Sequence, residues 1–137
     1  MSLAGKKIFI TGGSRGIGLA IALRAARDGA SIAIAAKTAD PNPKLPGTIF
    51  SAAEEIRSAG GVALPIQCDI RDENQIESAI RQAAQEFGGI DILINNAGLL
   101  INKPFETITH QDFHNSYQVN VIGIMEATQA FLPRLKA

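Results

Sequence analysis

The residues best suited to chemistry lie close to the N-terminus, in the run Thr11-Gly12-Gly13-Ser14-Arg15-Gly16-Ile17-Gly18. This run joins a short apolar segment to a segment with helical spacing. Glycines let the backbone approach a pyrophosphate, and a helix N-terminus offers unpaired N–H groups and a favourable dipole. The spacing is Gly-x-x-x-Gly-x-Gly, not the Gly-x-Gly-x-x-Gly of the common dinucleotide fingerprint. The run indicates a phosphate site, although a tight turn without a ligand would also use glycines.

Two further polar groups follow apolar runs. Asp69 comes after the run 62–68, and Asn95-Asn96-Ala97-Gly98 ends the run that starts at residue 90. Open α/β sheets bind ligands at the carboxyl ends of their strands, so we expect both groups to lie near the glycine-rich run. Each also has a plainer interpretation. Asparagine and glycine supply left-handed turn conformations, and Asp69 would fit a simple turn at a strand end.

The elements that must position these residues alternate along the chain. Strand-like apolar runs cover 7–11, 31–36, 62–68 and 90–95, and helical patterns cover 16–28, 48–59, 72–87 and the stretch from 109 onward. Strands that are apolar on both faces and alternate with helices predict an α/β fold with a doubly wound parallel sheet. We expect one domain over 1–137 with about four strands in the order 3-2-1-4, because the ligand crevice opens where the winding reverses.

The last helical stretch begins with Thr109 and Asp112, which resemble a capping box. Its candidate apolar anchors are Phe113, Ile124, Ala127 and Phe131. The stretch carries more apolar surface than one side of a four-stranded sheet needs, contributed by Ile122, Ile124, Met125, Ala127 and Phe131.

Composition excludes several classes of function. The 137 residues carry 13 basic and 13 acidic side chains, so net charge recruits neither nucleic acid nor an anionic membrane and does little to oppose self-association. No apolar run approaches the roughly 20 residues of a membrane helix, and the N-terminus lacks the layout of a secretory signal. The single cysteine, Cys68, argues against a disulfide framework or a multi-cysteine metal site. We expect a cytoplasmic protein without a metal.

Together the motifs resemble the short-chain dehydrogenase/reductase family over the whole chain. The resemblance rests on Thr-Gly-x-x-x-Gly-x-Gly, on Asn-Asn-Ala-Gly, on Asp69, and on Asn120 within Val119-Asn120-Val121. The stretch from Ile34 to Ile49 is similar to the hydroxysteroid dehydrogenase-like proteins of that family. The resemblance implies a Rossmann-type fold and a nicotinamide dinucleotide cofactor. It assigns cofactor binding to Gly12, Ser14, Arg15, Gly16, Ile17, Gly18, Lys37, Asp69, Ile70, Asn95, Ala97 and Gly98.

Specific roles follow from the same resemblance. Asp69 would contact the adenine, Asn95 and Ala97 would lie near the adenosine-side ribose, and Gly98 would permit close packing. Asn120 is the family's helix asparagine and the single catalytic residue of the family set that we identify here. It would hold a water near the catalytic lysine. The equally weighted alternative is that its side chain pins the helix by bonding to the main chain.

The end of the second strand bears on cofactor choice. An acidic residue there bonds the ribose hydroxyls and repels a 2′-phosphate, whereas a basic residue accepts the phosphate. Here the strand ends in Ala35-Ala36-Lys37-Thr38, and the first acid, Asp40, lies further along the proline-rich loop 38–47. Lys37 and Arg15 therefore favour NADP(H) over NAD(H), unless both are solvated surface charges.

Family chemistry is hydride transfer between nicotinamide and an alcohol or carbonyl carbon, with a proton donor in a Tyr-x-x-x-Lys pattern. The one tyrosine, Tyr117, is followed four positions later by Val121, so the pattern is absent. The catalytic serine, tyrosine and lysine would lie beyond residue 137. Two hypotheses follow: the cofactor-binding half of an NADP(H)-dependent oxidoreductase, or a stand-alone nucleotide-binding or interaction module. The oxidoreductase would act on a small-molecule carbonyl or alcohol, with steroid, fatty acyl and small carbonyl substrates all open. Since family members pair through the last helix, we expect a homodimer or homotetramer.

Overall fold

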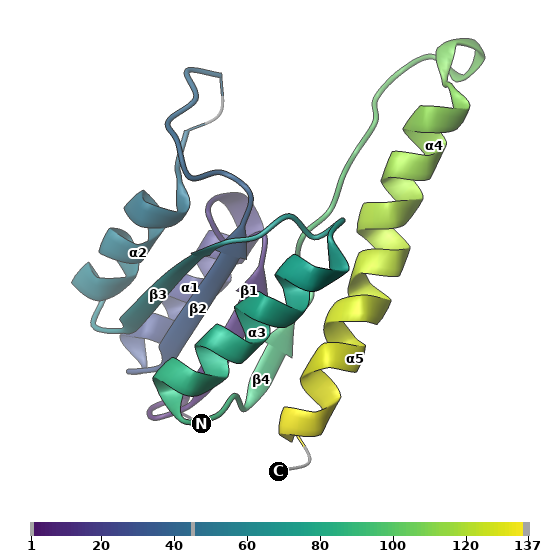
Figure 1. The fold of residues 1–137 in the computed structure, drawn as a ribbon. Coiled ribbons are helices and arrows are strands. Elements are labelled where there is room, and N and C mark those ends of the chain that lie inside the picture. Colours follow the sequence, from purple (N-terminus) through teal and green to yellow (C-terminus); the bar gives the residue numbers. More distant parts are fainter. Residues whose placement is uncertain (1, 45, 136–137) are drawn as a thin grey trace.

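The computed structural model describes residues 2–44 and 46–135, and a four-stranded parallel sheet lies at its centre (Figure 1). Its strands are β1 (Lys7–Thr11), β2 (Ser31–Ala36), β3 (Val62–Gln67) and β4 (Ile92–Ile94). They are ordered β3-β2-β1-β4, and all pairings are parallel. In register, Ile8 lies opposite Ile32 on one side and Ile92 on the other. The predicted α/β class and strand order 3-2-1-4 are confirmed.

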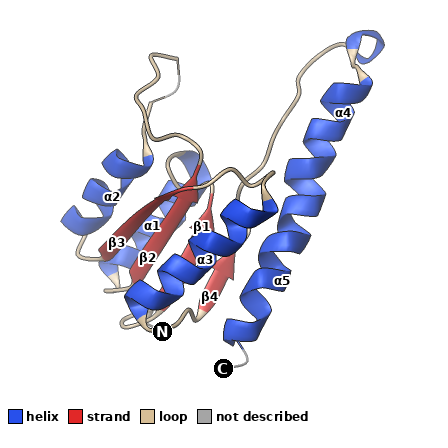
Figure 2. Cartoon of the chain, in the orientation of Figure 1, coloured by secondary structure: helices blue, strands red, loops and turns tan. Residues whose placement is uncertain are grey.

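Helices cover both faces of the sheet (Figure 2). The N-terminal layer consists of α1 (Gly16–Arg27) and α2 (Ile49–Ser58), and the opposite layer consists of α3 (Glu73–Phe87) and α5 (Gly123–Leu135). A 3₁₀ turn, Phe105–Thr107, precedes α4 (His110–Tyr117), which runs through a π-helical turn, Gln118–Ile122, into α5. Within the residues described, no helix combines the length and the apolar content that crossing a bilayer requires.

Two hydrophobic cores arise because alternate residues of a strand face opposite sides of the sheet. Ile8 and Ile10 of β1 are buried against the helix layer of α1 and α2, among alanines such as Ala22 and Ala52. Phe9, between them, is buried on the other face, together with Ile80 of α3 and Phe131 of α5. The small alanines on the first face allow α1 and α2 to approach the sheet closely. The cores fix the strand ends, and the ends carry the candidate site.

Side-chain caps begin α2, α3 and α4 but not α1. Asp72 accepts hydrogen bonds from the Asn74 and Gln75 amides at 3.0 and 3.3 Å, and Thr109 forms the predicted capping box with Asp112. Thr48 caps α2 in the same way. In contrast, Arg15 precedes α1 without a side-chain cap. The N–H groups that begin α1 therefore have no side-chain acceptor.

The last helical stretch departs from its predicted packing. Ala127 and Phe131 are buried against the sheet, as predicted, but Phe113 is 70% exposed and Ile124 is 39% exposed. The prediction that these two residues are buried anchors is therefore wrong. The reason is geometric. The α4–α5 rod, which is the continuous helix of α4, the π turn and α5, extends past the sheet at its α4 end (Figure 1). The π turn also changes which residues of this rod face α3.

Candidate cofactor-binding site

A cavity of about 620 Å³ opens at the carboxyl ends of the strands. Its wall combines the glycine-rich run after β1, the end of β2, the end of β3 and the loop after β4. Its volume lies in the usual range for small-molecule sites, and its position is the one where open α/β sheets bind ligands. Eight of the residues predicted to bind the cofactor line it: Gly12, Ser14, Arg15, Lys37, Asp69, Ile70, Ala97 and Gly98.

The glycine-rich run packs directly on the loop after β4. The Thr11 hydroxyl accepts hydrogen bonds from the amides of Asn96 and Ala97 at 3.1 and 3.0 Å, and the Asn96 side-chain amide donates to the Gly12 carbonyl at 3.0 Å. A Cβ on Gly12 would lie 2.9 Å from Ala97 Cα, and one on Gly18 would lie 2.7 Å from the Gly12 carbonyl oxygen. Two motifs 84 residues apart therefore form one rigid wall, and glycine is required where they touch.

The start of α1 has the properties of a phosphate site. It has no side-chain cap and no acidic residue in its first turn, so its amides and the positive end of the helix dipole are left for an anion. The Arg15 side chain adds charge here. Its Nη1 atom is buried and has no hydrogen-bond partner. A buried guanidinium nitrogen without an acceptor is costly in isolation, and a phosphate oxygen would satisfy it. These residues fit a dinucleotide phosphate.

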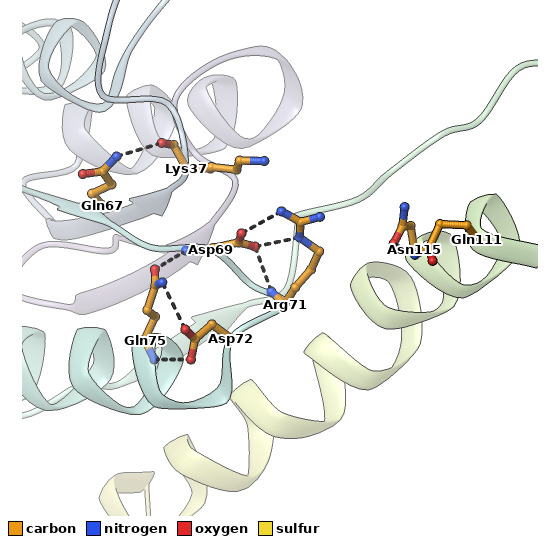
Figure 3. A network of polar contacts seen from close by, with 8 residues as sticks. All are labelled: Lys37, Gln67, Asp69, Arg71, Asp72, Gln75, Gln111 and Asn115. Atoms are coloured by element: carbon orange, nitrogen blue, oxygen red, sulfur yellow. Dashed lines mark hydrogen bonds and ion pairs between the residues drawn. The ribbon is translucent and has the colours of Figure 1, made fainter.

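The end of β2 brings a second cation to the cavity. Lys37 lines the wall, and its carbonyl accepts a hydrogen bond from the Gln67 side chain at 3.3 Å, which ties the ends of β2 and β3 together (Figure 3). The Ile49 amide donates to the Thr38 carbonyl at 3.0 Å and so closes the base of the loop that follows. Asp40, expected to lie further along the loop, also lines the cavity. The wall therefore carries one acid besides its cations near the end of β2.

At the end of β3, Asp69 is held at both its main chain and its side chain. Its amide donates to Gln75 Oε1 at 2.8 Å, and its carboxylate pairs with the Arg71 guanidinium, with Nη2 to Oδ2 at 2.8 Å. The hydrogen bond from Arg71 lowers the pKa of Asp69, and its amide bond from Arg71 and the charge of Lys37 act in the same direction. Asp69 is therefore an ionised acceptor at neutral pH.

Cys68, the residue before Asp69, has the opposite character. Burial, aided by the charges of Asp69 and Asp72, raises the pKa of its thiol to about 11. A protonated, buried thiol is a poor nucleophile, so Cys68 acts as a small apolar core residue.

Asn120 lies in the π turn and fastens the loop after β4. Its Oδ1 accepts from the Leu99 amide at 2.8 Å, and its Nδ2 donates to the Leu99 carbonyl at 2.8 Å and to the Ser116 hydroxyl at 3.1 Å. These are the contacts that a pinning role requires. Because Leu99 lines the cavity, Asn120 acts on the cavity wall through this loop.

Four predicted cofactor residues are not part of the cavity lining: Gly16, Ile17, Gly18 and Asn95. Ile17 is 76% exposed and lines a second cavity together with Ile92 and Ile94 of β4. The Asn95 side-chain amide donates to the Thr128 hydroxyl at 3.2 Å, toward α5. Sequence reasoning missed Asn96 and Arg71. The doubled asparagine was a visible signal for Asn96, whereas nothing in the spacing distinguishes Arg71 from an ordinary surface arginine.

Comparison with known proteins matches this geometry. The family model described as short chain dehydrogenase matches residues 6–137. Hydroxysteroid dehydrogenase-like protein 2 of Bos taurus is 56% identical over 135 residues, which are 98% of this chain and 32% of that protein. The chain spans about a third of the length of this curated relative.

Solved structures of short-chain dehydrogenases and reductases are also similar to this chain in sequence and fold. A short chain dehydrogenase from Mycobacterium thermoresistibile is 48% identical with a TM-score of 0.95, over 99% of this chain and 49% of that one. An NADH-dependent reductase solved with NAD is 30% identical with a TM-score of 0.85, over 98% of this chain and 53% of that one. From its motifs, its fold and these relatives, the chain belongs to the short-chain dehydrogenase family.

Proposed function

We propose that residues 1–137 form the cofactor-binding half of an NADP(H)-dependent oxidoreductase that acts on a carbonyl or alcohol group of a small-molecule substrate. The observation that carries the cofactor choice is Arg15: a guanidinium on the cavity wall with a buried Nη1 that has no partner. Lys37 brings a second positive charge to the same cavity. Two cations on one wall favour a phosphate ester on the ribose.

In this proposal the bound dinucleotide supplies the hydride, and the described residues bind and orient it. The uncapped start of α1 binds the pyrophosphate, and Arg15 and Lys37 donate hydrogen bonds to the 2′-phosphate. Asp69 accepts a hydrogen bond from the adenine, and the wall formed by Gly12, Ala97 and the loop that Asn120 pins limits access of water. Gly16, Ile17, Gly18, Ile70, Asn95 and Gly98 complete the proposed cofactor set.

NAD(H) is the competing cofactor, and one observation favours it. Asp40 lines the cavity, and a carboxylate near the ribose would repel a 2′-phosphate and accept from its hydroxyls. One similar solved protein is an NADH-dependent reductase. Asp40 is exposed, whereas the Arg15 nitrogen is buried and has no partner, so the balance favours NADP(H).

Calorimetric titration of NADPH and NADH into the intact protein tests the cofactor proposal. Each charge-assisted bond to the phosphate contributes about 1–3 kcal/mol, so NADPH should bind at least tenfold more tightly. Lys37→Asp should lower NADPH affinity and leave or improve NADH affinity, and Arg15→Met should weaken NADPH selectively. Asp40→Asn is the converse variant: it removes the carboxylate that would repel the 2′-phosphate, so it should strengthen NADPH binding. Equal affinities in the unmutated protein would overturn the preference for NADP(H).

A second candidate function is a nucleotide-binding or interaction module without turnover. It is favoured by one observation: Tyr-x-x-x-Lys, the acid–base pattern that the resemblance calls for, does not occur in the 137 residues. The mass of the expressed protein and the reading frame after Ala137 discriminate the two functions. Because the chain has a single cysteine, we also propose a cytoplasmic location, which fractionation of expressing cells would test.

A further inference from the structure

Arg71 and Asp69 form an ion pair on the cavity wall, in which both carboxylate oxygens of Asp69 accept hydrogen bonds from Arg71 (Figure 3). Arg71 Nε donates to Asp69 Oδ1 at 3.1 Å and Nη2 donates to Oδ2 at 2.8 Å. The Arg71 amide adds a third bond to Oδ1 at 3.0 Å. One residue therefore fixes both oxygens of the carboxylate, in the forked arrangement that is the most directional of arginine–carboxylate contacts.

The same pair differs from the other ion pairs described in the structure. Arg24–Asp28 and Arg57–Glu54 each join successive turns at the surface of one helix, and Lys103–Asp112 joins the loop after β4 to α4, outside the cavity lining. Such surface pairs add little to stability. Arg71–Asp69 instead lies at the mouth of a cavity, with side chains 40% and 25% exposed. The Asp69 amide is bonded to Gln75, so the residue is restrained from its main chain as well. The position and the restraint point to a function in ligand contact.

Counting acceptor sites shows what the pair leaves for a ligand. A carboxylate offers about four lone-pair sites, and the three bonds from Arg71 use two on Oδ1 and one on Oδ2. One site on Oδ2 remains. An ionised carboxylate accepts and never donates, so this site takes an N–H donor and rejects a carbonyl oxygen.

We propose that Arg71 is a positioning residue for base selectivity: by holding Asp69 as an oriented acceptor with one open site, it makes the cavity select adenine, which presents an amino group, over unsubstituted purine, which has no N–H donor at that position. The inference rests on the proposed function, since it presumes a dinucleotide whose adenine meets Asp69. It adds a residue that the motif does not contain. A site built to bond one polar group rejects the analogue that lacks it more strongly than an apolar pocket does.

The test compares two dinucleotides that differ at a single position of the base. NADPH and its analogue in which unsubstituted purine replaces adenine are titrated into the intact protein and into Arg71→Met and Arg71→Lys. The unmutated protein should prefer the adenine form by roughly tenfold or more, as expected for a charge-assisted bond. Arg71→Met should reduce that ratio several-fold, mainly by weakening NADPH. Arg71→Lys should restore it in part, because a lysine supplies charge without the fork.

Arg24→Met is the matched control, because it removes an arginine–aspartate pair that the structure places outside the cavity lining. It should leave the base ratio unchanged. An unchanged ratio in Arg71→Met, or an equal loss of both dinucleotides, would overturn the inference. Equal binding of NADPH and NADH with an intact base ratio would instead overturn the NADP(H) proposal alone. Failure of both dinucleotides to bind would refute the proposed function and this inference with it.

Discussion

At the scale of single residues, the site depends on polar side chains that hold loops rather than on isolated reactive groups. Thr11, Asn96 and Asn120 each bond to main-chain atoms of another segment, and together they fix the loop after β4 against the glycine-rich run and the last helix. Such bonds need exact geometry but no unusual pKa. Their loss should therefore affect stability and cofactor affinity before it affects chemistry.

Asn120→Ala should destabilise the protein. It removes two bonds to the Leu99 main chain and one to Ser116, and net hydrogen-bond contributions suggest a loss of about 1–3 kcal/mol in the free energy of unfolding. Urea denaturation measures it. Asn115→Ala, which removes one exposed bond from Gln111 on α4, is the control and should change stability by less than about 0.5 kcal/mol. Equal effects of the two substitutions would contradict the pinning role.

The pH dependence of cofactor binding should reveal the Asp69–Arg71 pair. Arg71 and the nearby charge of Lys37 lower the pKa of Asp69, so the acceptor stays ionised, and affinity should be lost only as the pH falls through that lowered value. In Arg71→Met the pKa of Asp69 rises, so the loss should begin at higher pH. NADP⁺ affinity, measured from about pH 2.5 to pH 7 so that the range includes the ordinary aspartate pKa of about 3.9, tests this. Superimposable profiles for the variant and the parent would count against it.

The sequence alone brought some of the cavity residues to attention and missed others, for a physical reason. Gly12, Ser14, Arg15 and Asp69 line the cavity because strand ends fix their positions directly. Arg71 went unrecognised, because its contact depends on the side-chain direction after a turn, which spacing along the chain does not encode. The exposure of Ile17 has a similar origin: helical periodicity indicates a face but not which element covers it.

At the scale of elements, the caps of α3 and α4 were predictable because each depends on a local pattern. The strand order was predictable because strands alternate with helices and the winding reverses at the ligand crevice. The π turn between α4 and α5 was not, because it arises where one extra residue is accommodated beside a tertiary contact. Asn120 lies within this turn and reaches Leu99 from it. The irregular element therefore coincides with the contact that joins the helix to the cavity wall.

Gly47 lies where the segment before α2 contacts the glycine-rich run. Its φ is +94°, and a Cβ there would lie 2.9 Å from the Ser14 carbonyl oxygen. Gly47→Ala should therefore destabilise the protein by more than about 1 kcal/mol and weaken NADPH binding by displacing Ser14 and Arg15. Gly5→Ala is the matched control: its φ is +74°, but a Cβ would meet nothing within 4 Å. If Gly5→Ala weakened NADPH binding equally, the close approach at Gly47 would not be the cause.

At the scale of the whole molecule, one surface of the α4–α5 rod is apolar and uncovered. Its exposed residues are Phe113, Tyr117, Val121, Ile124, Met125, Leu132 and Leu135. The rings of Phe113 and Tyr117 stack on it with centroids 6.5 Å apart. The surface that we expected to mediate self-association also contained Ala127 and Phe131, but both are buried against the sheet and are unavailable. The remaining residues support our proposal of a homodimer or homotetramer.

Met125→Glu should shift the intact protein toward monomer. Met125 is 51% exposed on this rod, and a carboxylate there would have to be desolvated on association. Sedimentation velocity at micromolar concentration measures the distribution. Phe50→Glu on α2, where the side chain is 55% exposed, is the control and should leave the assembly unchanged. Monomer alone in the unmutated protein would refute the proposed association.

The chain of residues 1–137 taken by itself should bind NADPH without reducing carbonyl substrates. Hydride transfer to a carbonyl carbon creates an alkoxide that must take up a proton, and a positioned acid typically supplies 10²–10⁴-fold of the rate, in order of magnitude about 3–5 kcal/mol. The described cavity wall has no counterpart of the phenol in Tyr-x-x-x-Lys: Tyr117 is absent from the lining, and the Cys68 thiol is buried and protonated.

Loss of nicotinamide absorbance with a panel of ketones and aldehydes measures turnover, using the 137-residue chain verified by mass. NADPH binding by the same preparation is the control for folding. Fusing residues 1–137 to the serine- and Tyr-x-x-x-Lys-bearing half of a similar short-chain dehydrogenase should then restore turnover, because the missing proton donor would be supplied in place. Steady turnover by the shorter chain would mean that one of its own residues supplies the proton. Tyr117→Phe would be the first variant to examine, since Tyr117 is the one phenol in the sequence.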